Sequence, residues 1–337
     1  MASNRPLPVM GDVARLAGVS HMTVSRVLNQ PESVRPETRD RVRLAIEQLG
    51  YRRNSAARSL VTRRSQTFGV VCFDTTLYGP ASTLNGIENA AEDAGYSVSV
   101  ASLRKSTPEA AAQAVQRLVD QSVDGLVLIV PETSAAASFF RALPTDLPVV
   151  AVESALPQIT SVAVDQVTGA RLLTDYLLSL GHETVHHVRG PSDWSEANGR
   201  VEGWHSALEE RGRVVPKSLA GDWSARSGYL AGQRLAKAPR VTAVFAANDS
   251  MALGVLRAFH EEGVRVPEDV SVVGFDDIPE AAYMTPPLTT VQQPFREVGR
   301  SSIEALLAAI EGTGAVGAST VIAPHLIVRD SAGAPRG

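Results

Sequence analysis

The chain has 337 residues, of which 44% are hydrophobic and 20% charged, and this composition is typical of a globular protein rather than a disordered one. Its apolar runs are much shorter than the roughly 20 residues that span a bilayer, and its single cysteine, Cys72, excludes an intrachain disulfide. The N-terminus lacks the continuous apolar stretch of a secretory signal. We therefore expect a cytoplasmic protein that makes no contact with a membrane.

The formal charge of −4 is distributed unevenly along the chain. Residues 1–65 contain twelve arginines and five acidic residues, a formal charge of +7, whereas the remainder carries −11. A basic segment on an acidic body indicates a polyanion partner for that segment, because arginine and lysine neutralise phosphates and release their counterions. A solvated basic tail would have the same charge, and charge alone does not distinguish the two.

The first 50 residues predict three short helices around a small core. The first two cover residues 12–17 and 22–28, with Gly18 in the turn between them and Ser20 placed to cap the second. A third begins near Pro36, whose fixed φ suits a first helical turn. Core positions recur at helical spacing: Val24, Val27, Leu28, Val42, Ala45, Ile46 and Leu49. This arrangement is a helix-turn-helix, and it leaves other faces of the second helix free for a ligand.

The chain beyond this head predicts a linker and then an α/β core. Residues 54–61 have a helical pattern but little apolar surface, so we expect them to fold on a partner. From residue 66, apolar strands alternate with amphipathic helices, which predicts two lobes, each a doubly wound parallel sheet. The expected strands are 68–72, 97–101, 125–129, 149–152, 162–164, 185–188, 243–246 and 270–275. The expected helices are 82–94, 108–121, 168–180, 200–211, 227–237, 250–262 and 295–310.

Polar side chains follow four of the expected strands at their carboxyl ends. These are Glu153, Asp165, the pair Asn248-Asp249 and the pair Asp276-Asp277. Each alone is explained more simply as a turn or cap residue. Ligands of open parallel sheets bind beyond the carboxyl ends of the strands, however, so four such positions together indicate a shared cleft.

Two other patterns resemble motifs but lack the required context. His182-Glu-Thr-Val-His186 has zinc-protease spacing, but Gly181 ends a helix and residues 184–188 predict a strand, which would hold the two histidines too far apart for one zinc ion. Gly312–Gly317 fits a dinucleotide-binding pattern, but it follows a helix and leads into strand-like residues 319–322. We expect neither a metal nor a cofactor.

The head carries the sequence DVARLAGVS over residues 12–20 and TVSRVLN over 23–29, which closely resembles the signature of the lac repressor family. The likeness is greater to the repressor that gives the family its name than to purine-binding members. It continues through residues 203–205, 221–225, 247–254, 271–277 and 286–290.

The resemblance implies a domain order for the whole chain. It implies a helix-turn-helix in residues 1–50, a hinge helix and linker in 51–65, and a tail in 332–337. Residues 66–331 would form an effector-binding core like that of periplasmic binding proteins. Its first lobe would contain about 66–163 and 294–322, and its second about 164–293 and 323–331.

The resemblance also implies which residues contact DNA. His21, Met22 and Arg26 match positions that reach base edges, and Arg26 is suited to guanine. The namesake repressor has Tyr and Gln where this chain has His21 and Met22, so we expect a different operator sequence. Leu60 matches a leucine inserted into the minor groove, although it would serve equally as a packing residue of a linker helix. The full set is Ser20, His21, Met22, Thr23, Ser25, Arg26, Asn29, Asn54, Ala57 and Leu60.

In the core, the resemblance implies a sugar site. Arg200, Asn248 and Asp276 match residues that hold hydroxyls, and Trp223 matches an indole that packs on the ring, although Trp223 also suits a simple core position. The full set is Leu77, Pro80, Glu153, Arg200, Trp223, Asn248, Asp276, Gln293 and Phe295. Four positions differ from the namesake repressor, which has Asp, Asn, Phe and Ser where this chain has Glu153, Ile129, Val164 and Glu196.

We therefore expect a repressor, not an enzyme, that a sugar such as a galactoside releases from a palindromic operator in the nucleoid. A co-repressor-dependent or activating regulator of the same family remains open. A sugar hydrolase or kinase would leave the basic head unexplained, and a periplasmic sugar-binding protein would not carry a helix-turn-helix. Because no leucine heptad follows residue 331, we expect a homodimer.

Overall fold

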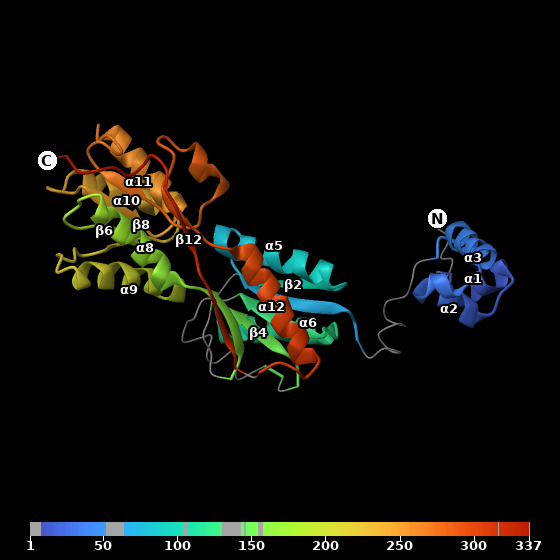
Figure 1. Ribbon diagram of the computed structural model, residues 1–337. Helices are drawn as coiled ribbons and strands as arrows, with labels where there is room; N and C mark the ends of the chain where they lie inside the picture. Colours follow the sequence, from blue (N-terminus) through green and yellow to red (C-terminus); the bar gives the residue numbers. More distant parts are fainter. Residues whose placement is uncertain are drawn as a thin grey trace. The chain divides into compact units, whose positions relative to one another are not determined.

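The computed structural model divides into two compact units, residues 1–65 and 66–337, drawn in Figure 1. Each unit has its own core and is described by itself. The residues described are 8–51, 64–103, 107–129, 143–144, 146–153, 158–315 and 317–336.

The N-terminal unit is the expected bundle of three helices. They are α1 (Met10–Ala17), α2 (His21–Asn29) and α3 (Pro36–Leu49), and a 3₁₀ turn, η1 (Pro31–Ser33), which the sequence analysis did not anticipate, follows α2. Gly18 ends α1 with a left-handed φ of 63°, and the Ser20 side chain accepts a hydrogen bond from the Thr23 amide at 3.1 Å, as expected of a turn and a cap. Val24 and Val42 are fully buried between the helices.

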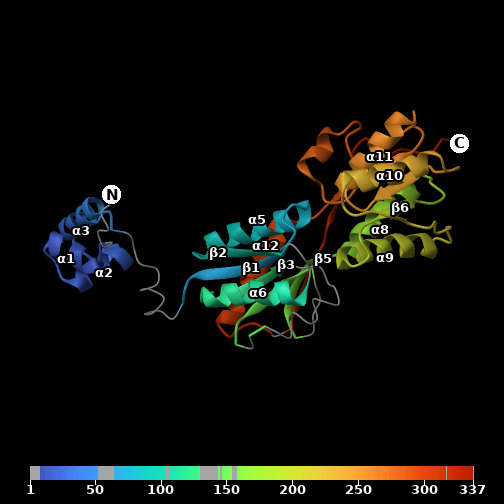
Figure 2. The ribbon, with the colours of Figure 1, turned by 180° about the vertical axis from the view of Figure 1, so that it is seen from behind.

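The first lobe of the larger unit is a six-stranded parallel sheet with the order β11-β5-β4-β3-β1-β2. Helices α5 and α12 pack on one face and α6 on the other, as the two opposite views in Figures 1 and 2 show. Gly86 and Gly299 allow α5 and α12 to touch backbone to backbone, since a Cβ on either would lie 2.5 Å or less from the other helix. The elements are β1 (Thr67–Phe73), α5 (Tyr78–Asp93), β2 (Ser97–Leu103), α6 (Pro108–Asp120), β3 (Gly125–Ile129), β4 (Val149–Val152), β5 (Thr160–Val164), α12 (Phe295–Ile310) and β11 (Ser319–Ile322).

The second lobe is a four-stranded parallel sheet with the order β7-β6-β8-β9. Helices α8 and α9 cover one face, and α10 and α11 cover the other. The elements are α8 (Gln166–Ser179), β6 (His186–Arg189), α9 (Ser195–Glu210), β7 (Leu219–Ala220), α10 (Ala225–Ala236), β8 (Ala243–Ala246), α11 (Asp249–Glu261), β9 (Ser271–Val273) and the 3₁₀ turn η2 (Pro279–Tyr283). Both lobes have the expected parallel, doubly covered architecture.

The chain passes between the lobes three times. It leaves the first lobe after β5, returns before α12, and leaves again after β11. Two short strands beside these passages, β10 (Thr290–Gln292) and β12 (His325–Ile327), pair antiparallel with each other. The sequence analysis missed both, because three residues carry too little periodicity to indicate a strand.

Several expected boundaries were wrong by two residues or more, among them those of α5, α9 and β9. Helix α5 begins at Tyr78 rather than at residue 82, and α9 begins at Ser195 rather than at residue 200. Strand β9 ends at Val273 rather than at residue 275, because the amides of Gly274 and Asp276 donate to Thr289 and Val291 instead of to the sheet.

Neither the zinc-like pattern of residues 182–186 nor the glycine pattern of residues 312–317 lies in the local structure that its motif requires. Only His186 of the zinc-like pattern lies in a strand, whereas residue 184 does not. Buried His182 contacts the hydroxyls of Thr242 and Ser271, each at 3.0 Å. Gly312 and Gly317 both have positive φ and lie between α12 and β11.

Over the part of the chain that is described, no helix is both long and apolar enough to cross a membrane.

Candidate functional site

One face of α2 presents polar side chains to solvent. His21, Arg26 and Asn29 are exposed, and 67% of the Met22 surface is exposed, which is unusual for a large apolar side chain. Val24 and Val27 occupy the opposite, buried face. The helix therefore divides into a face that holds the core and a face available to a ligand.

This face also has local order. The Ser20 and Thr23 hydroxyls are 2.9 Å apart, and the Asn29 amide donates to the Ser25 hydroxyl at 3.3 Å. Arg26 has no carboxylate partner among the described residues, whereas Arg15 pairs with Asp12. Asn54, Ala57 and Leu60 lie outside the described residues.

The larger unit contains a cleft that is lined by residues of both its lobes. The first lobe contributes side chains from the start of α5, the ends of β3 and β4, and the start of α12. The second contributes side chains from α9 and from the ends of its strands. All nine residues that the sequence analysis assigned to a sugar line this cleft, and they are joined by Tyr78, Gly79, Thr83, Ile129, Trp194 and Glu196.

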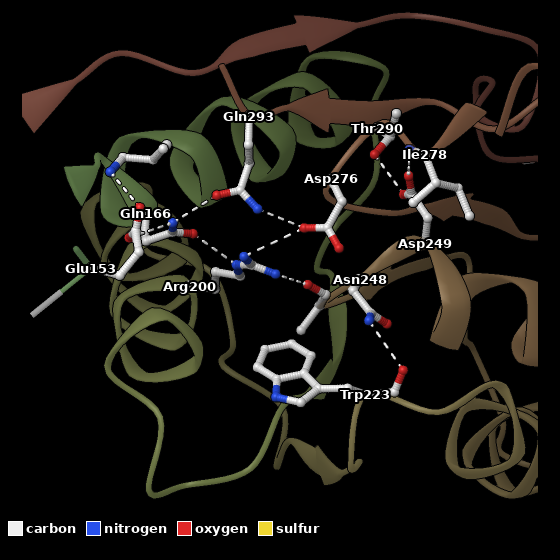
Figure 3. Close-up of polar contacts among 12 residues, drawn as sticks. Glu153, Gln166, Arg200, Trp223, Asn248, Asp249, Asp276, Ile278, Thr290 and Gln293 are labelled. Atoms are coloured by element: carbon white, nitrogen blue, oxygen red, sulfur yellow. Dashed lines mark hydrogen bonds and ion pairs between the residues drawn. The ribbon is translucent and has the colours of Figure 1, made fainter. Parts of the chain in front are cut away.

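Arg200 is the centre of the polar contacts, and only 4% of its surface is exposed (Figure 3). Its Nε donates to Gln166 Oε1 at 2.9 Å, Nη1 donates to the carbonyl of Ala247, and Nη2 lies 3.6 Å from Asp276 Oδ1. Gln293 closes the ring by donating to Asp276 at 2.7 Å and accepting from Gln166 at 2.9 Å. Each polar side chain is thus oriented by its neighbours.

The sequence analysis missed Gln166, the first residue of α8. It lies deeper than the cleft wall, where it links Arg200 to Gln293 and also donates to Glu153 at 3.2 Å. The signal was present, because Gln166 follows Asp165 at the end of β5, where the strand-end rule places ligand-binding groups.

Aromatic rings cover the apolar part of the cleft. The Arg200 guanidinium lies 5.3 Å from the centre of the Trp223 ring, and Trp194 packs edge-on against Trp223 with 5.7 Å between centroids. The Trp223 carbonyl accepts from the Asn248 amide at 3.1 Å, while the Asn248 Oδ1 caps α11. The Trp223 Nε1 is buried and has no hydrogen-bond partner within the described residues.

Three residues of the cleft have left-handed backbone conformations. Glu153, Trp223 and Asp276 have φ values of 59°, 72° and 112°. Such conformations are costly for residues other than glycine and persist where surrounding contacts hold them, commonly at ligand sites. Here the contacts include the Val164 amide on Glu153 at 2.9 Å.

Burial also shifts the charges of the cleft. It raises the pKa of Asp276 to about 6, although Arg200 acts in the opposite direction. Burial and then the neighbouring Glu196 raise the pKa of Glu153 to about 8, and burial raises the pKa of Glu196. Behind the cleft, burial and Asp276 raise the pKa of Asp249, which accepts from Thr290 and from the Ile278 amide. The cleft can therefore supply neutral as well as charged carboxyl groups.

Two protein families match parts of the chain. Residues 9–54 match the bacterial regulatory proteins of the lacI family, and residues 174–332 match a periplasmic binding protein-like domain. The chain is 36% identical over 327 residues to the lactose operon repressor of Escherichia coli K12, across 96% of this chain and 90% of that protein. It is 35% identical to the HTH-type transcriptional regulator CelR of Thermobifida fusca, across 97% of this chain and 99% of that protein.

Solved structures show the same similarity. A lac repressor dimer bound to operator and the anti-inducer ONPF has a TM-score of 0.88 at 34% identity, covering 97% of this chain and 99% of the other. A complex of the regulator CelR with cellobiose has a TM-score of 0.73 at 33% identity, covering 96% of this chain and 99% of the other.

Proposed function

The chain belongs to the lacI family of bacterial regulatory proteins, and we propose that it is a transcriptional repressor released from a palindromic operator by a sugar. The observation that carries this proposal is the pre-ordered polar ring around Arg200 beside Trp223, in a chain whose separate N-terminal unit is a helix-turn-helix. A galactoside is our first candidate for the sugar.

We assign DNA reading to residues 1–50 and the hinge to 51–65. His21, Met22 and Arg26 would contact base edges from the exposed face of α2, while Thr23, Ser25 and Asn29 would hold phosphates. Ser20, which caps α2, completes the DNA-binding set. Asn54, Ala57 and Leu60 would contact the minor groove at the centre of the operator. A homodimer would place two heads on a two-fold axis, which matches a palindromic site.

We assign sugar binding to the cleft of residues 66–331. Arg200, Asp276, Asn248 and Gln293 would bind hydroxyls, and Trp223 would lie against the apolar face of the ring. Leu77, Pro80 and Phe295 would form the opposite wall, and Glu153 would bind one end of the sugar. The ligand would touch both lobes, so its binding favours one arrangement of the lobes over another.

The mechanism follows from this bridging position. A sugar that stabilises one lobe arrangement changes the spacing at which two hinge segments meet the DNA. A coupling on the order of 1–3 kcal/mol per site is ordinary for allosteric proteins, and two sites in a dimer would combine their effects. A co-repressor would use the same cleft but stabilise the DNA-bound arrangement.

Binding of the full chain to DNA tests the proposal. We expect a palindrome selected from a random duplex pool to bind at least about a thousandfold more tightly than random DNA at physiological salt. A sugar found by a thermal-shift screen of mono- and disaccharides should then weaken that binding. Equal affinity for palindromic and random DNA would contradict the proposal, and tighter operator binding with sugar would identify a co-repressor.

A further inference from the structure

Glu153 and Glu196 form a carboxyl pair in the cleft. Neither makes an ion pair within the described residues, although the charge of Arg200 acts to lower the pKa of both. Glu153 directly follows β4 in the first lobe, and Glu196 lies in the first turn of α9 in the second. The Ser195 hydroxyl joins them, lying 2.8 Å from the main-chain oxygen of Glu153 and 3.1 Å from Glu196 Oε2. The pair therefore spans the two lobes.

The one cation that lines the cleft in the described part of the chain makes its closest contacts with groups other than this carboxyl pair. Among the described residues that line the cleft, Arg200 alone carries a positive charge, and each of its three nitrogens has an acceptor in Gln166, Ala247 or Asp276. The acidic side chains of the lining outnumber this cation by three to one. Two neighbouring carboxylates without an ion-pair partner favour binding of a cation between them and disfavour binding of a phosphate or carboxylate ligand.

The aromatic lining is compatible with the same ligand chemistry. Trp194 and Trp223 line the cleft with the carboxyl pair, and both are at least nine-tenths buried. An indole face attracts a cation as well as an apolar CH surface. A sugar ring with hydroxyls, an apolar face and one ammonium group would offer a contact to the polar side chains, the indoles and the carboxyl pair of the cleft.

We propose that the effector is an amino sugar whose ammonium group is bound by Glu153 and Glu196. This inference rests on the proposed function and specifies its ligand. The hydroxyls of the sugar would face Arg200 and Asp276, and its apolar face would lie on Trp223. Because the pKa of Glu153 is about 8 in the free protein, binding of the ammonium group would also displace a proton from the pair.

Calorimetry on the full chain tests the inference with matched ligands. Galactosamine should bind at least about tenfold more tightly than galactose at pH 7, because a charge interaction that shifts a pKa by one changes an equilibrium constant about tenfold. N-acetylgalactosamine should lose that advantage because its nitrogen is uncharged. Glucosamine, glucose and N-acetylglucosamine form a second series. The binding enthalpy of the amino sugar should depend on the buffer, since protons are released, whereas that of the neutral sugar should not.

Glu196→Gln provides the matched variant, because it removes the charge and retains the size. We expect it to abolish the preference for the amino sugar, measured as the ratio of the affinities for galactosamine and galactose. Glu202→Gln, an exposed substitution on the same helix, is the control and should retain the preference.

The outcomes separate this inference from the proposed function. Equal or weaker binding of the amino sugars, with neutral sugars bound, overturns the inference and leaves a sugar-controlled repressor. Absence of binding by any sugar, charged or neutral, overturns the proposed function itself. Should Glu196→Gln fail to fold, the buffer dependence of the unmodified protein still decides the matter.

Discussion

The exposed face of α2 and the interlobe cleft are built in opposite ways. On α2 the side chains assigned to DNA lie in solvent, and Arg26 has no carboxylate partner among the described residues. In the cleft, Arg200, Gln166, Asp276 and Gln293 are buried and bonded to one another. A polyanion supplies its own charges and needs only accessible cations, whereas a small ring with hydroxyl groups needs donors and acceptors already fixed in place. Substitutions should thus affect binding alone on α2, but both binding and stability in the cleft.

The largest effect is expected from Arg200→Ala. This change leaves Asp276 buried without its cation, so we expect the core to lose about 3–5 kcal/mol of unfolding free energy and to lose sugar binding. Operator binding at a temperature where the core remains folded should persist, because the head has its own core. Thermal unfolding, sugar titration and DNA binding measure the three quantities.

Exposed Arg234 on α10 is the matched control for this change. Its replacement by alanine should leave stability within about 0.5 kcal/mol. Normal sugar-induced release in Arg200→Ala would remove this residue from the effector site.

A smaller effect is expected from Arg26→Ala on α2. Its loss should cost about 1–3 kcal/mol in operator binding and relax the preference for guanine at one operator position, with no change in the thermal stability of the head. Binding to a set of operators with single base changes measures this preference. Arg15→Ala on α1 should leave the preference intact, and equal relaxation in both variants would contradict the role of Arg26.

The smallest effect is the pH dependence of core stability. Glu153 has a pKa raised from 4.5 to about 8, so between these values the folded protein holds a proton that the unfolded chain has lost. Stability therefore falls as pH rises through this window. Below pH 6.5 buried His187, with a pKa lowered to about 3, acts in the opposite direction, so the decline should be clearest between pH 6.5 and 8.

The slope for one group is at most about 1.4 kcal/mol per pH unit, and Glu153→Gln should reduce it. Denaturant unfolding at several pH values measures it. Stability that stays constant or rises between pH 6.5 and 8 would contradict the raised pKa.

The sequence predicted what depends on local pattern and missed what depends on long-range packing. Helical spacing located Val24 and Val42 in the core of the head, and apolar runs located most strands of the two sheets but not the two-residue β7. Glu196 was named among the departures from the namesake repressor around the sugar, although α9 was expected to begin five residues later than Ser195.

The polar ring around Arg200 could likewise be predicted only in part from the sequence. The strand-end rule indicated Asp276 and Asn248, whose positions depend on their own strands. The path of β10, which carries the chain toward Gln293, depends on backbone pairing with residues 274–276 and has no signal in its own three residues. Contacts that join distant segments are invisible to periodicity, which reports only the face of a single element.

The three passages between the lobes have a consequence for how the protein is made. The core of the first lobe includes Val298 and Leu306 of α12 and Ile322 of β11, although its other strands end by residue 164. Because chains emerge from the ribosome N-terminus first, this lobe cannot close until Ile322 at the end of β11 has been synthesised. The head needs only its first 51 residues, so its hydrophobic core can be complete on the nascent chain while the first lobe still awaits its final helix and strand.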